Sequence, residues 1–189
     1  MNWITDDAIH YEFNSNGFRG DEFSRESFIA LGCSFTMGSG LHQSQIWPEI
    51  LSKKLDIPVS NLGVYSAALD TCYRLLEAYI DELCPKFVVL CKPPIHRFEI
   101  LNDSLGRIVT PHAQINDELC RTWYSYDENS CINSRKNIRA MYQLCYEKNI
   151  KFYIMPELVT VDDARDFQHS GPISHETMVE KFLGVNKLL

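Results

Sequence analysis

The chain has 189 residues, of which 45% are hydrophobic and 23% are charged, and this balance is typical of one soluble globular domain covering 1–189. Its formal net charge of -7 argues against nucleic acid or an anionic membrane as the main partner. The longest apolar runs, such as 87–91, are far too short to span a bilayer, and the acidic amino terminus lacks the core of a signal peptide.

Cysteine and histidine usage bears on the compartment and on metal binding. The seven cysteines include no Cys-x-x-Cys pair, and their odd number suits reduced thiols in the cytoplasm better than a disulfide framework. The six histidines show no metal-ligand spacing with cysteine or with one another. We therefore expect a cytoplasmic protein with unpaired cysteines and no structural metal.

Residues 1–26 are expected to form a lead-in to the first strand. A turn signal at 14–17 separates two aromatic-bearing pieces and predicts an irregular or hairpin-like segment. Arg19 in this segment is expected to be solvated or in a salt bridge rather than to contact a ligand.

Four apolar runs are typical of buried parallel strands. They cover residues 28–31, 57–62, 86–91 and 150–155. Helical periodicity and capping residues predict four helices in the remaining sequence. These are 46–55 with Ser44 as its cap, a helix from Ser66 to 83, a helix opened by Asn133 or Ser134, and a last helix from Ser174 to near Gly184.

The segment 92–131 lacks sustained periodicity and contains several prolines. We expect a long excursion here, with short strands at 98–101 and 107–110. Loops of this length inside compact domains usually carry function or cover a site. The excursion is therefore expected to shape the substrate pocket.

Strands that alternate with helices predict an α/β fold with a parallel sheet covered on both faces. Such folds bind ligands at the carboxyl ends of their strands. Ser34, Gly63, Lys92 and the loop 157–171 each follow a predicted strand, so they are expected to converge on that edge.

The stretch 28–40 changes at Gly32 from an apolar run to small and hydroxyl residues, which suits a tight strand-to-helix turn. Ser34 in this turn is a candidate nucleophile. Alternatively, Ser34 caps a helix, or Ser34, Thr36 and Gly38 bind a phosphate. No Lys follows the glycines as in a Walker loop, and Thr36 replaces the last glycine of a Gly-x-Ser-x-Gly elbow.

The loop after the fourth strand places Asp166 three residues before His169. A carboxylate on the Nδ1 of a histidine holds the tautomer that leaves Nε2 free to act as a base. An isolated pair of this kind is more often two solvated loop residues, but this loop is expected to meet Ser34 at the sheet edge. Together the three side chains predict a Ser-His-Asp triad.

These motifs resemble the sequence blocks of the SGNH (GDSL-type) hydrolases, in particular small bacterial and phage members. Gly32-Cys33-Ser34 stands at the nucleophile block, Asn61-Leu62-Gly63 at the second block, and Asp166-x-x-His169 at the last block. Asn16-Gly17-Phe18-Arg19 and Trp47-Pro48-x-x-Leu51 also resemble features of the small members. The likeness runs from about Gly17 to Phe182. It implies the SGNH hydrolase fold, a three-layer sandwich with a flavodoxin-like parallel sheet flanked by helices.

The resemblance also implies roles for individual residues. Ser34 would attack the ester, Asp166 and His169 would complete the triad, and the N–H groups of Ser34 and Gly63 would stabilise the oxyanion. No cofactor is implied.

The sequence departs from the family pattern at two places. Cys33 replaces the usual Asp beside the nucleophile, and the third block, Gly-x-Asn-Asp, is absent after the third strand. The family Asn donates a hydrogen bond to the oxyanion, and losing one such donor costs about 10²–10³ in rate. Lys92, His96 and Arg97 are the candidate substitute donors.

The resulting hypothesis is a serine esterase that transfers the acyl group of a small ester or an acetylated carbohydrate to water. The missing Asn motivates an alternative, a catalytically weak or inactive SGNH-like binding module. A second alternative is a flavodoxin-like phosphate or flavin binder that uses Ser34, Thr36 and Gly38 and leaves Asp166 and His169 without a role. The sequence does not predict the oligomeric state.

Overall fold

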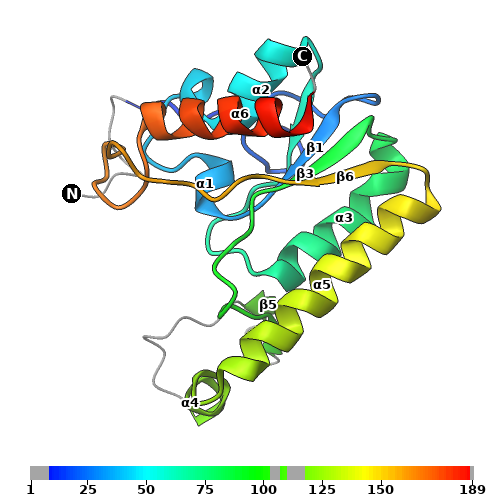
Figure 1. Cartoon of the computed structure of the whole chain (residues 1–189), viewed down its shortest axis with the longest axis vertical. Coiled ribbons are helices and arrows are strands. Elements are labelled where there is room, and N and C mark those ends of the chain that lie inside the picture. Colours follow the sequence, from blue (N-terminus) through cyan, green and yellow to red (C-terminus); the bar gives the residue numbers. More distant parts are fainter. Residues whose placement is uncertain (1–8, 103–106, 110–117, 188–189) are drawn as a thin grey trace.

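A computed structural model describes residues 9–102, 107–109 and 118–187 (Figure 1). Its main sheet contains four parallel strands in the order β2-β1-β3-β6. Each strand lies within one of the predicted apolar runs, so the predicted parallel α/β sheet is confirmed. The strands are β1 (Phe28–Leu31), β2 (Val59–Asn61), β3 (Phe87–Leu90) and β6 (Lys151–Ile154).

Helices cover both faces of this sheet (Figure 1). The helices α2 and α6 pack together on one face, and α3 and α5 pack together on the other. Ile29 and Leu31 of β1 belong to the core under α3 and α5, whereas Phe28 and Ala30 belong to the core under α2 and α6. The chain is therefore a three-layer α/β sandwich. Its helical segments are α1 (Ser34–Met37), the 3₁₀ turn η2 (Gln43–Gln45), α2 (Trp47–Leu55), α3 (Leu69–Leu83), α4 (Glu118–Tyr124), α5 (Asp127–Glu147) and α6 (Pro172–Asn186).

The excursion 92–131 contains more structure than the sequence predicts. Its two short strands, β4 (Ile100–Asn102) and β5 (Arg107–Val109), pair antiparallel with each other in a separate sheet. The helix α4 and the start of α5 follow within the same segment. Residues 103–106 and 110–117 lie outside the described residues, and so does the end of the strand predicted at 107–110.

Ser44 and Ser66 do not cap the helices that they were expected to open. Ser44 lies in the 3₁₀ turn η2, and Ile46 precedes α2. Ser66 lies in a turn with φ of 60°, and Ala68 precedes α3. The N–H of Ala68 donates to Thr71 Oγ1 (3.0 Å), so a side chain inside the helix satisfies this end.

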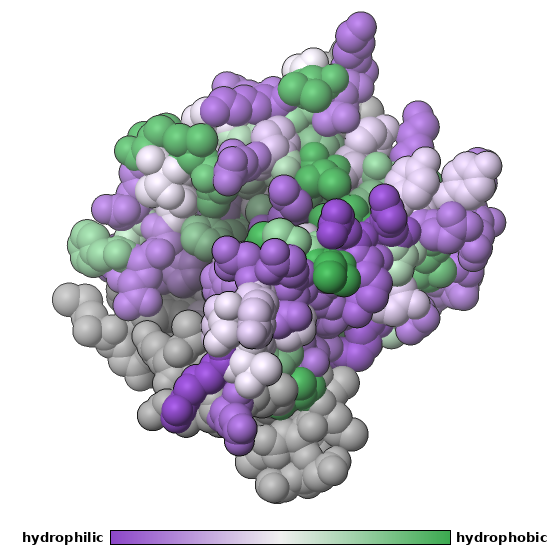
Figure 2. All heavy atoms as spheres, turned by 60° about the horizontal axis from the view of Figure 1, so that its bottom comes forward, coloured by the Kyte–Doolittle hydropathy of each residue, from purple (hydrophilic) through white to green (hydrophobic). Residues whose placement is uncertain are grey.

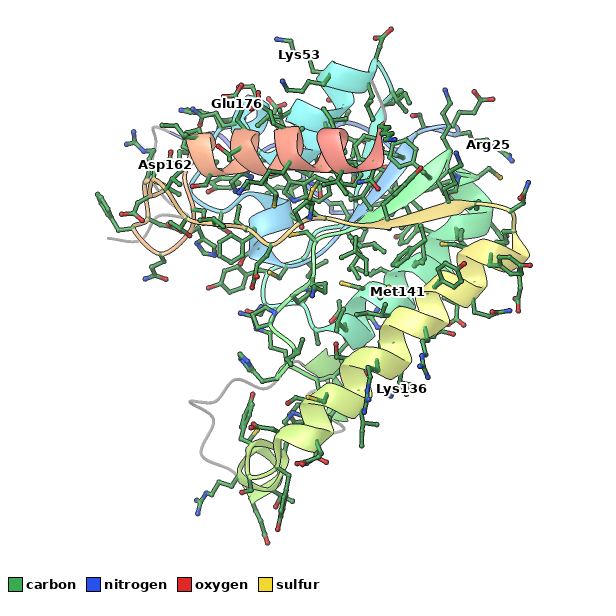
Figure 3. All side chains as sticks on the ribbon, viewed as in Figure 1. Arg25, Lys53, Lys136, Met141, Asp162 and Glu176 are labelled. Carbon is green, nitrogen blue, oxygen red and sulfur yellow. The ribbon has the colours of Figure 1, made fainter. Side chains whose placement is uncertain are left out.

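The last two helices also start elsewhere than predicted. Asn133 and Ser134 lie inside α5, where both are buried. The helix α6 begins directly after Gly171 and continues through Gly184, so Ser174 lies inside its first turn. Figure 3 shows the side chains of these helices: Met141 of α5 is buried in the core shared with α3, whereas Lys136 is exposed.

The lead-in forms a small hairpin-like turn as predicted, because Phe13 and Arg19 make an antiparallel bridge around Gly17, whose φ is 81°. Residues 1–8 of the lead-in lie outside the described residues. Arg19 was expected to be solvated or in a salt bridge, and the first of these alternatives is wrong, since the residue is 1% exposed.

Hydrophobic side chains are scattered among hydrophilic ones on the face that Figure 2 shows. Among the described residues, no helix is both long enough and apolar enough to cross a membrane.

Candidate active site

The nucleophile candidate follows a turn that requires glycine. Directly after β1, Gly32 has φ of 157°. A Cβ on Gly32 would lie 2.8 Å from the carbonyl oxygen of Cys91 and closer still to Thr36 Oγ1, so a side chain does not fit. Ser34 is the first residue of α1 and is buried. The turn therefore places the Ser34 hydroxyl at the carboxyl edge of the sheet.

Neighbouring side chains hold α1 in place. Trp47 Nε1 donates to Thr36 Oγ1 (3.2 Å), and Asn61 Nδ2 donates to the Thr36 carbonyl oxygen (3.1 Å). Gly38 ends the helix with φ of 85°, and its N–H donates to the Ser34 carbonyl oxygen (2.7 Å). Because these groups are used inside the protein, the arrangement argues against a phosphate bound by Ser34, Thr36 and Gly38.

The loop after β6 brings Asp166 and His169 to Ser34. His169 Nε2 lies 2.8 Å from Ser34 Oγ, and His169 Nδ1 lies 2.6 Å from Asp166 Oδ2. The other carboxylate oxygen, Oδ1, accepts the backbone N–H groups of Gln168 and His169, each at 3.0 Å. The ring of Phe35 meets the imidazole at an angle of 64°, with ring centroids 5.0 Å apart. The structure thus assembles the three predicted side chains in hydrogen-bonded sequence.

Asp166 is held in its charged form. Burial raises the pKa of this carboxyl group, but hydrogen bonds from the Gln168 backbone and from His169 outweigh burial, and its pKa lies below the usual value. A charged carboxylate favours the imidazole tautomer with its proton on Nδ1 and its lone pair on Nε2. Ser34 can then donate its hydroxyl hydrogen to Nε2, which is the geometry of a serine activated by a general base.

Asp162 anchors the loop that carries this pair to the start of α6. Its Oδ1 accepts the N–H (2.8 Å) and the hydroxyl (2.6 Å) of Ser174, and its Oδ2 accepts the N–H of Ile173 (3.0 Å). Its carbonyl oxygen accepts the N–H of Gly171 (2.8 Å). Although burial raises the pKa of Asp162, the hydrogen bonds from Ser174 and Ile173 hold it below the usual value. These hydrogen bonds join the two ends of the loop, at Asp162 and at the start of α6.

The second histidine of this region, His175, is structural. Its Nδ1 accepts the backbone N–H of Trp47 (3.0 Å), which joins α6 to the start of α2. Burial lowers the pKa of His175 to about 4, against the opposing effect of Asp162 and with a further lowering by His169. The ring is therefore neutral at neutral pH, and one of its nitrogens is already used.

Gly63 reaches the expected edge of the sheet, but its N–H has another partner. It donates to Asn61 Oδ1 (2.9 Å), so this arrangement does not present it to an oxyanion. The expected role requires Asn61 to release that bond. A Cβ on Gly63 would lie 2.7 Å from the carbonyl carbon of Thr36 and closer still to the nitrogen of Met37, which is a steric reason for glycine. Ser34 opens α1, and N–H groups in a first helical turn have no acceptor within the helix.

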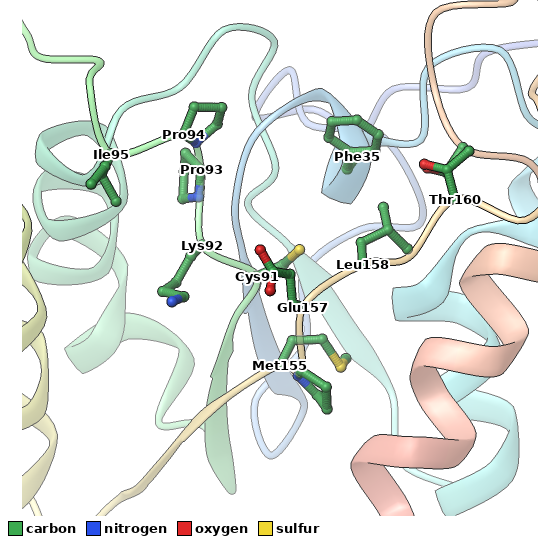
Figure 4. Close-up of a pocket in the computed structure, with 12 residues that line it drawn as sticks. Phe35, Cys91, Lys92, Pro93, Pro94, Ile95, Met155, Glu157, Leu158 and Thr160 are labelled. Atoms are coloured by element: carbon green, nitrogen blue, oxygen red, sulfur yellow. The ribbon is translucent and has the colours of Figure 1, made fainter.

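The three candidate substitute donors lie in different surroundings. Lys92 is exposed and lines a pocket on the side opposite Phe35 (Figure 4). The carbonyl oxygen of His96 accepts the indole N–H of Trp123 (2.9 Å), and Arg97 Nη1 donates to the carbonyl oxygen of Ala67 (3.4 Å). Neither of these two hydrogen bonds involves Ser34, and a role of any of the three side chains at the oxyanion stays a prediction.

The pocket in Figure 4 has a volume of about 460 Å³ and opens between the segments that follow β3 and β6. It adjoins the site, because Phe35 follows Ser34 in the chain and Ser170 follows His169. Most of its wall is apolar, with one positive and one negative side chain. The lining residues are Phe35, Cys91, Lys92, Pro93, Pro94, Ile95, Met155, Pro156, Glu157, Leu158, Thr160 and Ser170.

Two residues of this region, Asp162 and His175, were not singled out from the sequence. Asp162 looks like an ordinary polar loop residue, and His175 follows Ser174, which was expected to cap the last helix. The adjacent acidic residues Asp162 and Asp163, which precede the last helix, are the signal that could have indicated a carboxylate at the start of that helix, since Asp is favoured there. Within the described part of the chain, no cluster of three or more His, Cys, Asp or Glu residues suits a metal ion.

No protein-family model and no curated protein matches this sequence. Solved structures do match. The acetyl xylan esterase Est2A from the rumen bacterium Butyrivibrio proteoclasticus is similar over 90% of this chain and 66% of its own length, with a TM-score of 0.52 and 12% identity. The present chain thus spans just under two thirds of that enzyme.

Two further structures illustrate the same similarity. AlinE4, an SGNH-hydrolase family esterase, matches over 87% of this chain and 73% of its own, with a TM-score of 0.47 and 14% identity. The psychrotrophic esterase EstA from Pseudoalteromonas sp. matches over 86% and 72%, with a TM-score of 0.42 and 16% identity. At 12% identity and a TM-score of 0.52, the likeness to Est2A shows the fold alone and leaves the substrate open.

Proposed function

We propose that this chain, which has the SGNH hydrolase fold, is a serine esterase that transfers the acyl group of a small ester or an acetylated carbohydrate to water. One observation carries the proposal, namely the continuous hydrogen-bonded chain from Ser34 Oγ through His169 to Asp166, at 2.8 Å and 2.6 Å. A helix-capping serine needs no such partners. Two esterases among the structural neighbours support the same reaction class.

In the proposed mechanism, Ser34 Oγ attacks the ester carbonyl while His169 Nε2 takes its proton. The tetrahedral intermediate collapses when His169 returns this proton to the leaving alcohol. Water then attacks the acyl-serine, again with His169 as the base, and the acid is released. Asp166 keeps the imidazole oriented and stabilises its protonated form. The N–H of Ser34 is the first oxyanion donor, and the pocket beside Phe35 has room for the acyl or alcohol part.

The test combines turnover with covalent labelling. The purified protein should hydrolyse p-nitrophenyl esters from a series of graded chain length, and a fluorophosphonate should label one serine. Ser34→Ala should abolish both, whereas Ser44→Ala, at an exposed serine of the neighbouring turn, should change neither. Asp166→Asn should lower kcat by as much as about 10⁴-fold, because it favours the wrong tautomer. Full activity in Ser34→Ala would overturn the proposal.

A second candidate, a catalytically inactive binding module, is favoured by two observations. The third family block with its Asn donor is missing, and the Gly63 N–H is occupied by Asn61. A wild-type protein that takes no fluorophosphonate label and hydrolyses no ester of the series would favour this module.

A further inference from the structure

The lead-in segment is bound directly to the end of the nucleophile helix. The buried guanidinium of Arg19 donates from Nη1 to the carbonyl oxygens of Met37 (3.1 Å) and Gly38, and from Nη2 to that of Leu41 (2.6 Å). Met37 is the last residue of α1, so these carbonyl groups include the unpaired ones at the helix end. A cation is favourable at this position, because the carboxyl end of a helix carries partial negative charge.

Burying this cation has a cost that the site only partly offsets. Burial lowers the pKa of Arg19, while Tyr11 and Glu49 raise it. The guanidinium lies over the Tyr11 ring, with Cζ 4.3 Å from the ring centroid, which is a cation–π contact. Its Nε is buried without a hydrogen-bond partner among the described residues. The guanidinium is therefore buried where its main hydrogen bonds go to the carbonyl groups at the end of α1 and in the residues that follow.

The segment 38–41 that Arg19 holds also contacts the other half of the triad. The N–H of Gly40 donates to the hydroxyl of Tyr11 (2.8 Å), and the N–H of Arg165 donates to the carbonyl oxygen of Gly40 (3.2 Å). Gly40 lies directly against Asp166, since a Cβ on it would be 3.0 Å from Asp166 Cγ. The segment is thus fixed on one side by the lead-in and supports Asp166 on the other.

We propose that Arg19 is a positioning residue that sets the placement of Ser34 relative to the Asp166–His169 pair through the segment 38–41. The inference rests on the proposed function. Ser34 and His169 are supplied by segments 135 residues apart, so their 2.8 Å hydrogen bond depends on how α1 and the loop after β6 are placed against each other. Gly40 is a point where these two segments touch, and Arg19 holds the segment that contains it.

The geometry requires arginine rather than a generic cation. Nη1 and Nη2 point to carbonyl oxygens at the two ends of the segment, Met37 and Gly38 at one end and Leu41 at the other. A lysine ammonium is a single point charge and cannot reproduce this fork. Arg19→Lys therefore keeps the charge and loses one end of the clamp.

The test compares Arg19→Lys with Arg25→Met, a matched control in the same lead-in whose exposed side chain contacts Cys84. Arg19→Lys should lower kcat by about 10–100-fold with KM changed less than twofold, because misplacement by about 1 Å costs about 10² in rate. The fluorophosphonate labelling rate should fall by the same factor, and Arg25→Met should match the wild type in both. Rates are expressed per labelled site, and circular dichroism gives Tm.

A purely structural role would lower Tm but leave kcat per labelled site unchanged, and that result in Arg19→Lys would overturn the inference. Tyr11→Phe is a milder variant that keeps the ring under the guanidinium and removes the acceptor of the Gly40 N–H. It should lower kcat by roughly 3–10-fold, in line with the loss of one hydrogen bond of about 1 kcal/mol. An active wild type with unaffected Arg19→Lys and Tyr11→Phe variants would sink this inference alone. A wild type that takes no label and hydrolyses no ester would sink the proposed function as well.

Discussion

Two glycines of this chain differ in what surrounds their missing side chains. Gly63 lies against the backbone of α1, at Thr36 and Met37, and has no room for a Cβ. Gly184 lies inside α6, and a Cβ there would meet no atom within 4 Å. The first glycine permits close packing beside Ser34. The second makes no close contact and only increases the conformational freedom of the unfolded chain, which folding must then remove.

These surroundings predict opposite effects of the same substitution. Gly63→Ala should lower the free energy of unfolding by about 1–3 kcal/mol, because backbone must move to admit the methyl group, and kcat should fall with it. Gly184→Ala should raise the free energy of unfolding by roughly 0.5–1 kcal/mol and leave kcat unchanged. Urea unfolding at pH 7 measures both variants. Equal stability of Gly63→Ala and wild type would contradict the packing described here.

The site residues that could be predicted from the sequence are those that belong to a recognisable chemical pattern. The turn at Gly32 and the Asp-x-x-His spacing are local features, so Ser34, Asp166 and His169 could be named in advance. The partner of the Gly63 N–H could not, because it depends on the rotamer of Asn61. Arg19 was misjudged since arginine is mostly exposed, and nothing local reveals carbonyl groups that lie 18–22 residues further along the chain.

At the scale of the elements, α6 is joined both to the loop that carries Asp166 and His169 and to α2. Asp162 accepts the N–H groups of its first turn, and His175 accepts the N–H of Trp47. Burial lowers the pKa of His175 to about 4, whereas an unfolded histidine titrates near pH 6.5. The pKa of Asp162 lies below its usual value, so protonation of this carboxylate affects stability only at more acidic pH.

The sign of the resulting pH dependence follows from proton binding. Between about pH 6.5 and 4 the unfolded state binds a proton at position 175 and the folded state does not, so stability falls as pH falls. From pH 7 to pH 5 this histidine should remove about 2 kcal/mol of the free energy of unfolding. His175→Asn offers an oxygen to the Trp47 N–H and should flatten this part of the curve. His10→Asn, at an exposed histidine, should leave the curve unchanged, and an unaltered slope in His175→Asn would contradict the assignment.

Helix starts were the least predictable elements, for a physical reason visible in α5. The buried face of its first half is polar, and Asn133 and Asn137 both donate to the carboxylate of Asp70 on α3. Hydrophobic periodicity therefore begins only near residue 138, and the polar residues before it resemble a cap. Likewise, the Ser174 hydroxyl donates to Asp162 instead of capping α6. A polar residue that hydrogen-bonds to a neighbouring helix or loop cannot be told from a helix-capping residue by its sequence alone.

At the scale of the whole molecule, the parallel α/β sandwich was predictable because each buried strand is a continuous apolar run. The excursion 92–131 was not, since its hairpin and α4 lie outside the main sheet and have no strong periodic pattern. All seven cysteines lie among the described residues and no disulfide joins any two of them; five of the seven are buried. Burial raises the pKa of Cys91 and of Cys145 to about 12, which keeps these thiols protonated and unreactive.

The cysteines therefore predict two different thiol counts. Titration of the native protein should detect the exposed Cys84 and Cys131 rapidly, and titration in denaturant without reductant should detect all seven. A count of three or fewer in denaturant would show disulfides and would contradict the reducing compartment that the composition indicates.

The separation of Ser34 and His169 by 135 residues also has a consequence for a chain that is still being made. At roughly 5–20 residues per second, the ribosome adds the histidine about 7–27 s after the serine. During that interval Ser34 is an ordinary alcohol on a nascent polypeptide. Because the loop with His169 is anchored to α6, a chain interrupted before that helix lacks the contacts that hold this loop beside Ser34. If the proposed function holds, hydrolytic activity requires synthesis to continue through α6, and products that end before this helix would have none.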